Sequence, residues 1–391
     1  MSGRLGDVAA FIRGITFKPE DVVPVGTPGT VACMRTKNVQ TELDLSDVWG
    51  VADALVKRDD QYLHEGDILV SSANSWNLVG KCCWIPPIPW RASFGGFVSV
   101  LRADPSRIDP RYLFHWFGSG RIQATVRSFG QQTTNISNLN IERCLNQSLP
   151  LPPLPEQRRI AEVLDRAEAL RAKRRAALAQ LDTLTQSIFL DMFGDPVANT
   201  RSWPTKKLSS LGSLDRGVSK HRPRNAPELL GGSHPFVQTG DVANSNGYIR
   251  TFTGTYSDAG LRQSRMWPAG TLCITIAANI AKTGILTFEA CFPDSVVGFR
   301  ADDPATVEFV RSWLSFLQAS LEENAPESAQ KNINLEILRG LDVPTPEIGL
   351  QQVFAGRVAA VERLKASHRA SLTELDTLFS SLQHRAFRGE L

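Results

Sequence analysis

The hydrophobic positions of the chain form two long helical stripes, separated by a segment of short apolar runs. Between residues 156 and 191 apolar side chains recur at alternating intervals of four and three residues, with Arg174 as a charged interruption. A similar stripe between residues 350 and 387 is interrupted at His368. This spacing is typical of helices that pair in a coiled coil. The predicted helix-pair interface consists of Val163, Ala167, Leu170, Leu181, Leu184, Ile188, Val361, Leu364, Leu375, Leu378 and Leu382.

The two stripes belong to an internal repeat. A shift of 194 residues without a gap places Pro150 on Pro344, Pro152 on Pro346 and Gln157 on Gln351. Prolines fix φ and lack an N–H donor, so residues 149–155 are predicted to form an extended, stiff linker before the first helix. A helix of roughly 36 residues is ~54 Å long at ~1.5 Å per residue. Pairing buries both stripes in one chain, and a pseudo-two-fold relation between the halves makes the pair antiparallel.

The segments before the two proline-rich linkers look like copies of one strand-rich domain. Short apolar runs bounded by Gly, Pro, Asn and Asp predict strands at residues 30–34, 67–70 and 96–101. A helix is predicted at residues 110–127, with Asp109 as its N-cap. In the second copy Arg216-Gly217-Val218 lines up with Arg13-Gly14-Ile15.

The predicted fold class is therefore α+β, with two duplicated strand-rich mixed α/β domains separated by two long antiparallel helices forming a coiled coil. The expected boundaries are 1–148 for the first domain, 149–196 for the first linker and helix, 197–342 for the second domain, and 343–391 for the second linker and helix.

Composition and charge are those of an ordinary globular protein. The chain has 391 residues, of which 42% are hydrophobic and 21% charged. Its formal net charge of +3 is too small to indicate nucleic-acid binding by itself. The six cysteines have no Cys-x-x-Cys spacing and no nearby histidine, which predicts free thiols and no metal site. The sequence has neither an apolar run of the ~18–20 residues that span a bilayer nor a signal peptide. These features predict a cytoplasmic protein without a membrane partner.

The sequence carries no recognisable catalytic motif. It lacks the phosphate-binding loop Gly-x-x-x-x-Gly-Lys-[Ser/Thr], the dinucleotide motif Gly-x-Gly-x-x-Gly, the zinc motif His-Glu-x-x-His and the nucleophile motif Gly-x-Ser-x-Gly. An Asn-Pro-Pro-aromatic element, which an adenine methyltransferase would need, is also missing. We therefore predict no catalytic residues on this chain, and disfavour a nuclease or methylase of unusual design.

Polar and basic loops recur at matching points of the two domains. Amide side chains can pair with adenine, Arg and Lys with guanine, and Lys, Ser and Thr with phosphates. Singly, each loop is better explained as an ordinary solvated turn, but their recurrence at matching points shifts the balance towards DNA binding. The candidate DNA-binding residues are Arg13, Lys18, Arg35, Lys37, Asn38, Ser72, Asn74, Ser75, Trp76, Asn77, Lys81, Gln131, Gln132, Thr133, Lys220, Arg222, Arg224, Asn244, Asn246, Asn279, Lys282, Gln330 and Lys331.

The order of domain, proline-rich linker, helix, second domain and second helix resembles the specificity (S) subunit of type I restriction-modification systems. The resemblance is carried by residues 149–157 (Leu-Pro-Leu-Pro-Pro-Leu-Pro-Glu-Gln), 66–69 (Gly-Asp-Ile-Leu) and 330–333 (Gln-Lys-Asn-Ile), and it covers essentially the whole chain. The second linker is degenerate and lacks the Glu-Gln pair.

The resemblance implies that two target recognition domains each read one half of a bipartite, asymmetric site in double-stranded DNA, and that the helix pair sets the gap. It implies two methyltransferase (M) subunits that supply S-adenosylmethionine and the catalytic residues for adenine methylation. It also implies, in a restricting complex, restriction (R) subunits that use ATP and Mg, while this chain itself carries no cofactor. The alternative is a coiled-coil adaptor with two protein-binding domains and no direct DNA contact.

Overall fold

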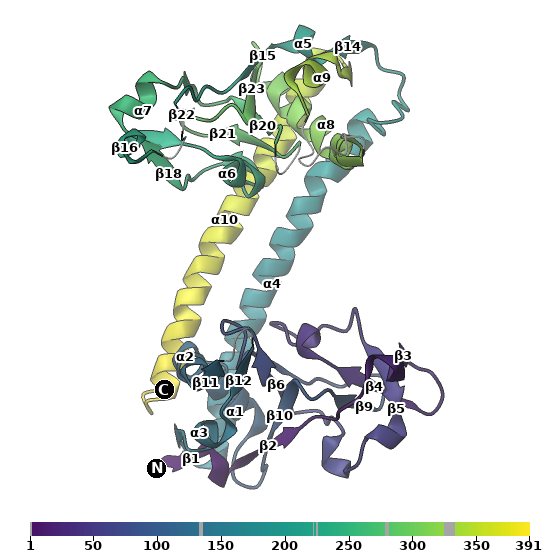
Figure 1. Cartoon of the computed structure of the whole chain (residues 1–391), viewed down its shortest axis with the longest axis vertical. Helices are drawn as coiled ribbons and strands as arrows, with labels where there is room; N and C mark the ends of the chain where they lie inside the picture. Colours follow the sequence, from purple (N-terminus) through teal and green to yellow (C-terminus); the bar gives the residue numbers. More distant parts are fainter. Residues whose placement is uncertain (1, 133–135, 222, 224–225, 278–280, 324–332) are drawn as a thin grey trace. The chain divides into compact units, whose positions relative to one another are not determined.

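The computed structural model describes residues 2–132, 136–221, 223, 226–277, 281–323 and 333–391 (Figure 1). The chain divides into two compact units. Unit 1 comprises Met1–Arg175 with Ala370–Leu391, and unit 2 comprises Ala176–Arg369. Each unit therefore contains one strand-rich domain and parts of both long helices, α4 (Leu154–Phe193) and α10 (Ile348–Ala386). The predicted α+β class and the two long helices are confirmed.

In its described residues, the domain of unit 1 is built from short strands, three α-helices and several single 3₁₀ turns. Its helices are α1 (Pro110–Phe117), α2 (Gly120–Ser128) and α3 (Ile141–Leu145). Its strands are β1 (Ser2–Arg4), β2 (Ala9–Arg13), β3 (Val23–Pro24), β4 (Thr30–Met34), β5 (Trp49–Ala52), β6 (Ile68–Ser71), β7 (Ala73–Asn74), β8 (Cys82–Trp84), β9 (Ala92–Phe94), β10 (Val98–Ala103), β11 (Gly130–Gln132), β12 (Ser137–Leu139) and β13 (Ser148–Pro150). The three strands predicted in this domain correspond to β4, β6 and β10.

The domain of unit 2 is built in the same way. Its helices are α5 (Leu208–Leu211), α6 (Thr239–Ala243), α7 (Asp258–Arg262), α8 (Pro304–Glu323) and α9 (Leu335–Gly340). Its strands are β14 (Thr205–Lys207), β15 (Ser213–Arg216), β16 (Leu230–Phe236), β17 (Gly247–Ile249), β18 (Gly254–Tyr256), β19 (Met266–Trp267), β20 (Leu272–Thr275), β21 (Thr283–Leu286), β22 (Ala290–Cys291), β23 (Val296–Arg300) and β24 (Asp342–Pro344).

The two domains share one strand order, as the repeat in the sequence predicts. The main sheet of unit 1 has the order β2-β10-β6-β8, and that of unit 2 has the order β15-β23-β20-β21-β17. A second sheet in each unit contains one parallel pair, β4 with β9 and β16 with β22. A two-stranded sheet, β1 with β13 or β14 with β24, joins the start of each domain to its proline-rich linker.

The helix predicted at residues 110–127 is broken into α1 and α2, which corrects the prediction. Gly118, Ser119 and Gly120 are poor helix formers, and Ser119 adopts the extended conformation of an N-cap residue. The predicted start of α1 is confirmed, because the Asp109 side chain accepts a hydrogen bond from the backbone N–H of Tyr112.

A buried glutamine anchors the first long helix to its linker and to the domain. The side-chain amide of Gln157 donates to the carbonyl of Pro152 at 2.8 Å and accepts from the N–H of Asp109 at 2.8 Å. Gln351, its repeat partner, donates to Pro346 at 2.8 Å, whereas its Oε1 has no partner in the described part of the chain. The repeated proline and glutamine positions thus perform a shared structural task.

The α4 helix is also fixed to the domain of unit 1 by an ion-pair cluster. Asp165 receives hydrogen bonds from Nε2 of the buried His115 at 2.7 Å and from Nε of Arg111 at 3.0 Å. Burial raises the pKa of the Asp165 carboxyl, but the hydrogen bonds from His115 and Arg111 outweigh it and lower that pKa to about 2. Asp165 is therefore ionised across the physiological pH range.

The long helices run antiparallel within each unit. In unit 1, Arg159 binds the carbonyl of Leu391 at 2.8 Å, while Arg171, further along α4, binds Asp376, earlier on α10, at 2.6 Å. In unit 2, Asp182 pairs with Lys365 at 3.0 Å. Further along α4, the rings of Phe193 and Phe354 lie 5.3 Å apart. Residue numbers thus rise on one helix as they fall on the other.

The predicted helix-pair interface needs correction at four positions. Leu170, Leu184, Leu364 and Leu378 are between 40% and 52% exposed, so they lie outside the buried faces of the helices. The buried faces include Ile160, Leu164 and Ala167 on α4, which join the core of the unit 1 domain. Each helix thus packs against a domain as well as against the other helix, so its buried face differs from the predicted stripe. Ala167 and Val361 are buried and Val163, Leu181, Ile188, Leu375 and Leu382 are half-buried, and their place in the interface remains a prediction.

Candidate nucleic-acid interface

Three segments of the unit 1 domain converge at one end of its main sheet, where β6 ends and β10 begins (Figure 1). The N–H groups of Ser72 and Ala73 both donate to the carbonyl of Phe97 at 3.0 Å. On the other side, β7 pairs with β12, and the N–H of Leu139 donates to the carbonyl of Ser72 at 2.8 Å. The structure therefore brings together two of the predicted loops, 72–77 and the segment that contains β11.

The loop after β6 is ordered by its own polar side chains. Asn74 donates to Ser71 Oγ at 3.1 Å and accepts from the N–H of Ser75 at 2.8 Å. Ser75 Oγ donates to Asn77 Oδ1 at 2.7 Å. Asn74 is thus used within the loop, which presents Ser75, Trp76 and Asn77 outward.

Two exposed aromatic side chains mark this surface. Trp76 is 55% exposed, and Phe97, which the sequence analysis did not single out, is 64% exposed. Aromatic faces can stack on nucleic-acid bases or contact the methyl group of thymine. An apolar residue directly after Gly95-Gly96 in a turn is the sequence signal that points to Phe97.

A neighbouring loop, residues 35–48, is attached to this surface through Lys81, whose Nζ donates to Gln40 Oε1 at 2.5 Å. Within the loop, the guanidinium of Arg35 lies 3.4 Å over the ring of Trp49 and pairs with Asp47 at 3.0 Å. Lys37 pairs with the same carboxylate at 2.7 Å. Hydrogen bonds from Lys37 and Arg35 lower the pKa of Asp47, so this carboxylate stays charged and holds both cations.

Asn38 was predicted to contact DNA, whereas the structure gives its side chain a role within the loop. Its side chain is buried and donates to the carbonyls of Asp44 at 2.7 Å and Asp47 at 3.0 Å, while accepting from the N–H of Arg35. These bonds use the amide to hold the loop together. Exposed asparagines and loop-building asparagines look alike in a sequence, because both follow strands and precede turns.

The remaining candidates of the first domain are spread around its rim. Arg13 and Lys18 are exposed, and Lys18 lies 3.5 Å from Glu20. Gln131 and Gln132 belong to β11, where only the backbone is described. Thr133 lies outside the described residues, as do Arg222, Arg224, Asn279, Gln330 and Lys331 of the second domain.

In the second domain, Asn244 and Asn246 are exposed in the loop between α6 and β17. They line a hollow of about 350 Å³ together with Arg250, a residue that the sequence analysis passed over. Arg250 also pairs with Glu362 of α10 at 2.8 Å. Because amide and guanidinium groups share one hollow, this site can hold both base edges and phosphates.

The other described candidates of the second domain lie apart from that hollow. Lys220 is exposed, and its N–H is held by Gln263 Oε1 at 2.7 Å. Lys282 is half-buried and donates to Gln318 of α8 at 3.2 Å. The N–H of Ile333 donates to the carbonyl of Ile276 at 3.1 Å, repeating the contact of Leu139 with Ser72. The two domains therefore share this backbone contact.

The six cysteines are free, as predicted. Burial raises the pKa of Cys33, Cys83 and Cys144 to about 12, so these thiols stay protonated and serve as core residues. Among the described residues, no helix combines the length and the apolar character that a membrane crossing requires.

Comparison with known proteins places both halves of the chain in one family. The model of the type I restriction modification DNA specificity domain matches residues 1–180 and 201–377. The specificity subunit of the type I restriction enzyme EcoKI from Escherichia coli is 24% identical, over 98% of this chain and 87% of that protein. The putative MjaX specificity subunit from Methanocaldococcus jannaschii is 20% identical, over 99% and 92%.

Two solved structures share the fold. The S subunit of a type I restriction-modification system from M. genitalium has a TM-score of 0.57 at 15% identity, with 99% of this chain and 96% of that chain covered. A chain from a study of the assembly and conformational transition of the type I system has a TM-score of 0.58 at 18% identity, with 100% and 98% covered.

Proposed function

This chain belongs to the type I restriction-modification DNA specificity family and is a DNA sequence-recognition subunit; from this premise we propose that each of its two domains reads one half of a bipartite, asymmetric site. In this proposal α4 and α10 set the gap between the half-sites. The family does not favour the alternative of an adaptor without DNA contact.

The observation that carries the proposal is the duplication of one strand order with different loops. The main sheets share four strands in the same order, while the loops that follow β6 and β20 differ in sequence. A shared scaffold with divergent loops is the arrangement that gives one chain two specificities, because base contacts come from loop side chains and not from the sheet.

The chemistry is assigned to partners. Two methyltransferase subunits would supply S-adenosylmethionine and the residues that methylate an adenine flipped out of the duplex. Restriction subunits would use ATP and Mg in a complex that also cleaves. The relatives are named as specificity subunits of type I restriction enzymes, which supports this division of labour.

The purified chain is expected to transfer no methyl group from S-adenosylmethionine to host DNA, and to bind DNA sequence-specifically once its methyltransferase partner is added. The measurement is incorporation of labelled methyl groups, together with a mobility shift on DNA with and without the methylation site. Methylation by the chain alone would refute the non-catalytic role.

Substitutions of an exposed and of a buried residue in the loops of the first domain are expected to affect different properties, DNA binding and stability respectively. Trp76→Ala should weaken site-specific binding of the assembled complex by about tenfold, since base–aromatic stacking contributes ~1–3 kcal/mol, and should leave thermal stability unchanged. Asn38→Ala should instead lower stability by about 1–3 kcal/mol, because buried carbonyls lose their donor. Competition binding and thermal unfolding of both variants check this, and a drop in stability for Trp76→Ala would contradict it.

A further inference from the structure

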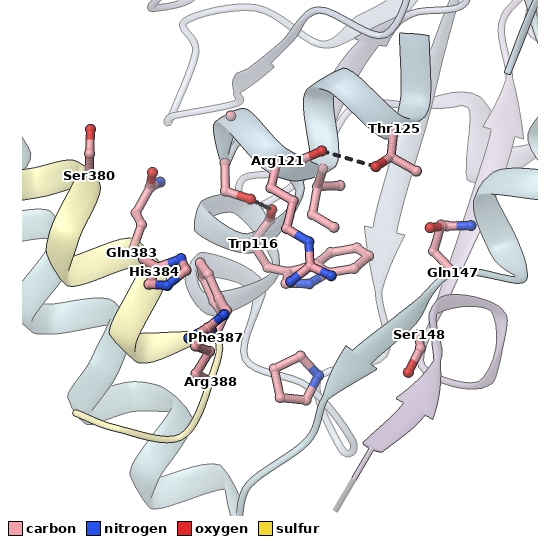
Figure 2. A pocket seen from close by; sticks show the side chains of 14 residues that line it. Trp116, Arg121, Thr125, Gln147, Ser148, Ser380, Gln383, His384, Phe387 and Arg388 are labelled. Carbon is pink, nitrogen blue, oxygen red and sulfur yellow. Dashed lines mark hydrogen bonds between the residues drawn. The ribbon is translucent and has the colours of Figure 1, made fainter. Parts of the chain in front are cut away.

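Unit 1 contains a cavity of about 430 Å³ that the DNA-binding surface does not use (Figure 2). Its walls are the start of α2, the last turns of α10 and residues 147–150. Tyr112 supports this wall, since its hydroxyl donates to the carbonyl of Pro150 at 3.0 Å and its ring meets Phe387 edge-on at 5.4 Å. The volume lies within the usual range of ligand pockets, ~300–1,000 Å³.

The internal repeat allows the residues that line the cavity of unit 1 to be compared with their counterparts in unit 2. Helices α1 and α8 begin at Pro110 and Pro304, and strands β13 and β24 at Ser148 and Asp342, so a shift of 194 residues relates the two ends of this region, although unit 2 has the single helix α8 where unit 1 has α1 and α2. Under that shift the cavity residues Ser119, Ile122 and Gln383 correspond to Trp313, Phe316 and Phe189.

In unit 2 these three aromatic side chains belong to the hydrophobic core. Trp313 and Phe189 are buried, and the rings of Phe189 and Phe316 lie 5.1 Å apart. The matching positions of unit 1 therefore carry three side chains that are not aromatic. Concave surface hollows of this size, lined by apolar groups and a few converging polar ones, are places where proteins commonly bind a further group.

The charge of the cavity is as distinctive as its volume. Arg121, His384 and Arg388 stand where unit 2 has Ser315, Leu190 and Gly194. None of the 14 lining residues is Asp or Glu, and in the described part of the chain neither Arg121 nor Arg388 has an ion-pair partner. Figure 2 shows Arg121 on α2 and His384 and Arg388 on α10 among the residues that line the hollow.

We propose that this cavity docks an acidic segment of a partner protein that inserts an aromatic side chain. The inserted ring would pack in the hollow, where three lining positions have the aromatic counterparts Phe189, Trp313 and Phe316 in unit 2. Carboxylates on either side of the ring would pair with Arg121 and Arg388. The inference rests on the proposed function, which requires protein partners. A protein segment fits better than duplex DNA, because a concave hollow of this size admits a side chain and not a double helix.

The test uses the full chain and a fluorescein-labelled peptide with one phenylalanine flanked by two aspartates on each side. Fluorescence anisotropy should show saturable binding, weakened about tenfold or more by Arg121→Glu or Arg388→Glu, since lost charge-assisted contacts have effects of this size. Lys206→Glu, an exposed charge reversal on β14 of unit 2, should leave binding unchanged. A peptide with serine in place of phenylalanine should bind about tenfold more weakly.

A filled cavity provides a second variant. Ser119→Trp copies the residue of unit 2 and should abolish peptide binding; Ile122→Phe is the milder alternative if Ser119→Trp lowers the unfolding temperature. The proposal is overturned if the wild-type chain does not bind the peptide, if both filled variants bind it normally, or if Lys206→Glu weakens binding equally.

Duplex DNA and inorganic phosphate serve as competitors in the same assay. Displacement of the peptide by either at physiological salt, with a parallel loss of their binding in Arg121→Glu, would assign the cations to a phosphate group and overturn the proposal. Sequence-specific DNA binding at saturating methyltransferase partner is measured separately. If that binding fails in the wild-type chain, the proposed function is refuted, whereas failure of the peptide alone refutes only the docking site.

Discussion

Replacing Phe189 by alanine is expected to destabilise unit 2 by about 3–5 kcal/mol, the cost of deleting a fully buried phenylalanine. Phe189 is 1% exposed. Its ring lies 4.9 Å from Phe193, 5.1 Å from Phe316, 5.4 Å from Phe309 and 5.5 Å from Phe354. These rings come from α4, α8 and α10, so the truncation leaves a void where three helices meet.

Amide hydrogen exchange of the two units, followed through a urea titration, measures this effect without assuming that the whole chain unfolds at once. Leu190→Ala is the matched control, because its side chain is on the exposed side of α4 next to Phe189; it should change stability by less than about 1 kcal/mol. Equal losses for the two variants would show that the aromatic cluster does not hold unit 2 together.

The aromatic cluster around Phe189 shows what the hydrophobic spacing of the sequence could and could not predict about the long helices. The alternating spacing located both long helices to within two residues, and the repeat established that there are two domains. It could not identify the buried face, because the pattern treats every apolar residue alike, while Phe189 is buried by α8 of the flanking domain and Leu184 faces solvent. Contacts made by a separate domain leave no period in the helix itself.

The candidate DNA-binding loops were also predictable from the sequence only in part. That a polar loop follows the buried strand β6 could be read from the sequence, since buried strands commonly end in solvated turns. Whether an amide in such a loop faces outward, as Asn77 does, or satisfies buried carbonyls, as Asn38 does, depends on backbone groups brought together by folding. Lys81 and Gln40 likewise meet across 41 positions of sequence.

Lengthening both long helices by one heptad is expected to move the two half-sites apart without changing their sequences. Arg171 of α4 pairs with Asp376 of α10 in unit 1, and Asp182 of α4 pairs with Lys365 of α10 in unit 2. An insertion between Leu178 and Leu184 therefore has to be matched by one between Arg363 and Arg369, or the ion pairs on one side of it are lost.

Seven residues add about 10 Å at ~1.5 Å per residue and turn a helix by close to two full turns, so the same faces stay in contact. At ~3.4 Å per base pair along each strand, the tolerated gap should grow by about three base pairs, and methylation at the original spacing should be lost. Single-molecule sequencing of methylated adenines in a host expressing the variant measures gap and half-sites together.

The control for the heptad insertion places seven residues in the turn between Gly26 and Gly29. A methyl group added at either glycine would meet no neighbouring atom within 4 Å, so this turn has open space around it. The control variant should therefore leave the gap unchanged, because the added residues lie in a loop of the first domain and not along the helices. An unchanged gap in the helix variant, or altered half-sites, would show that the helices do not set the spacing.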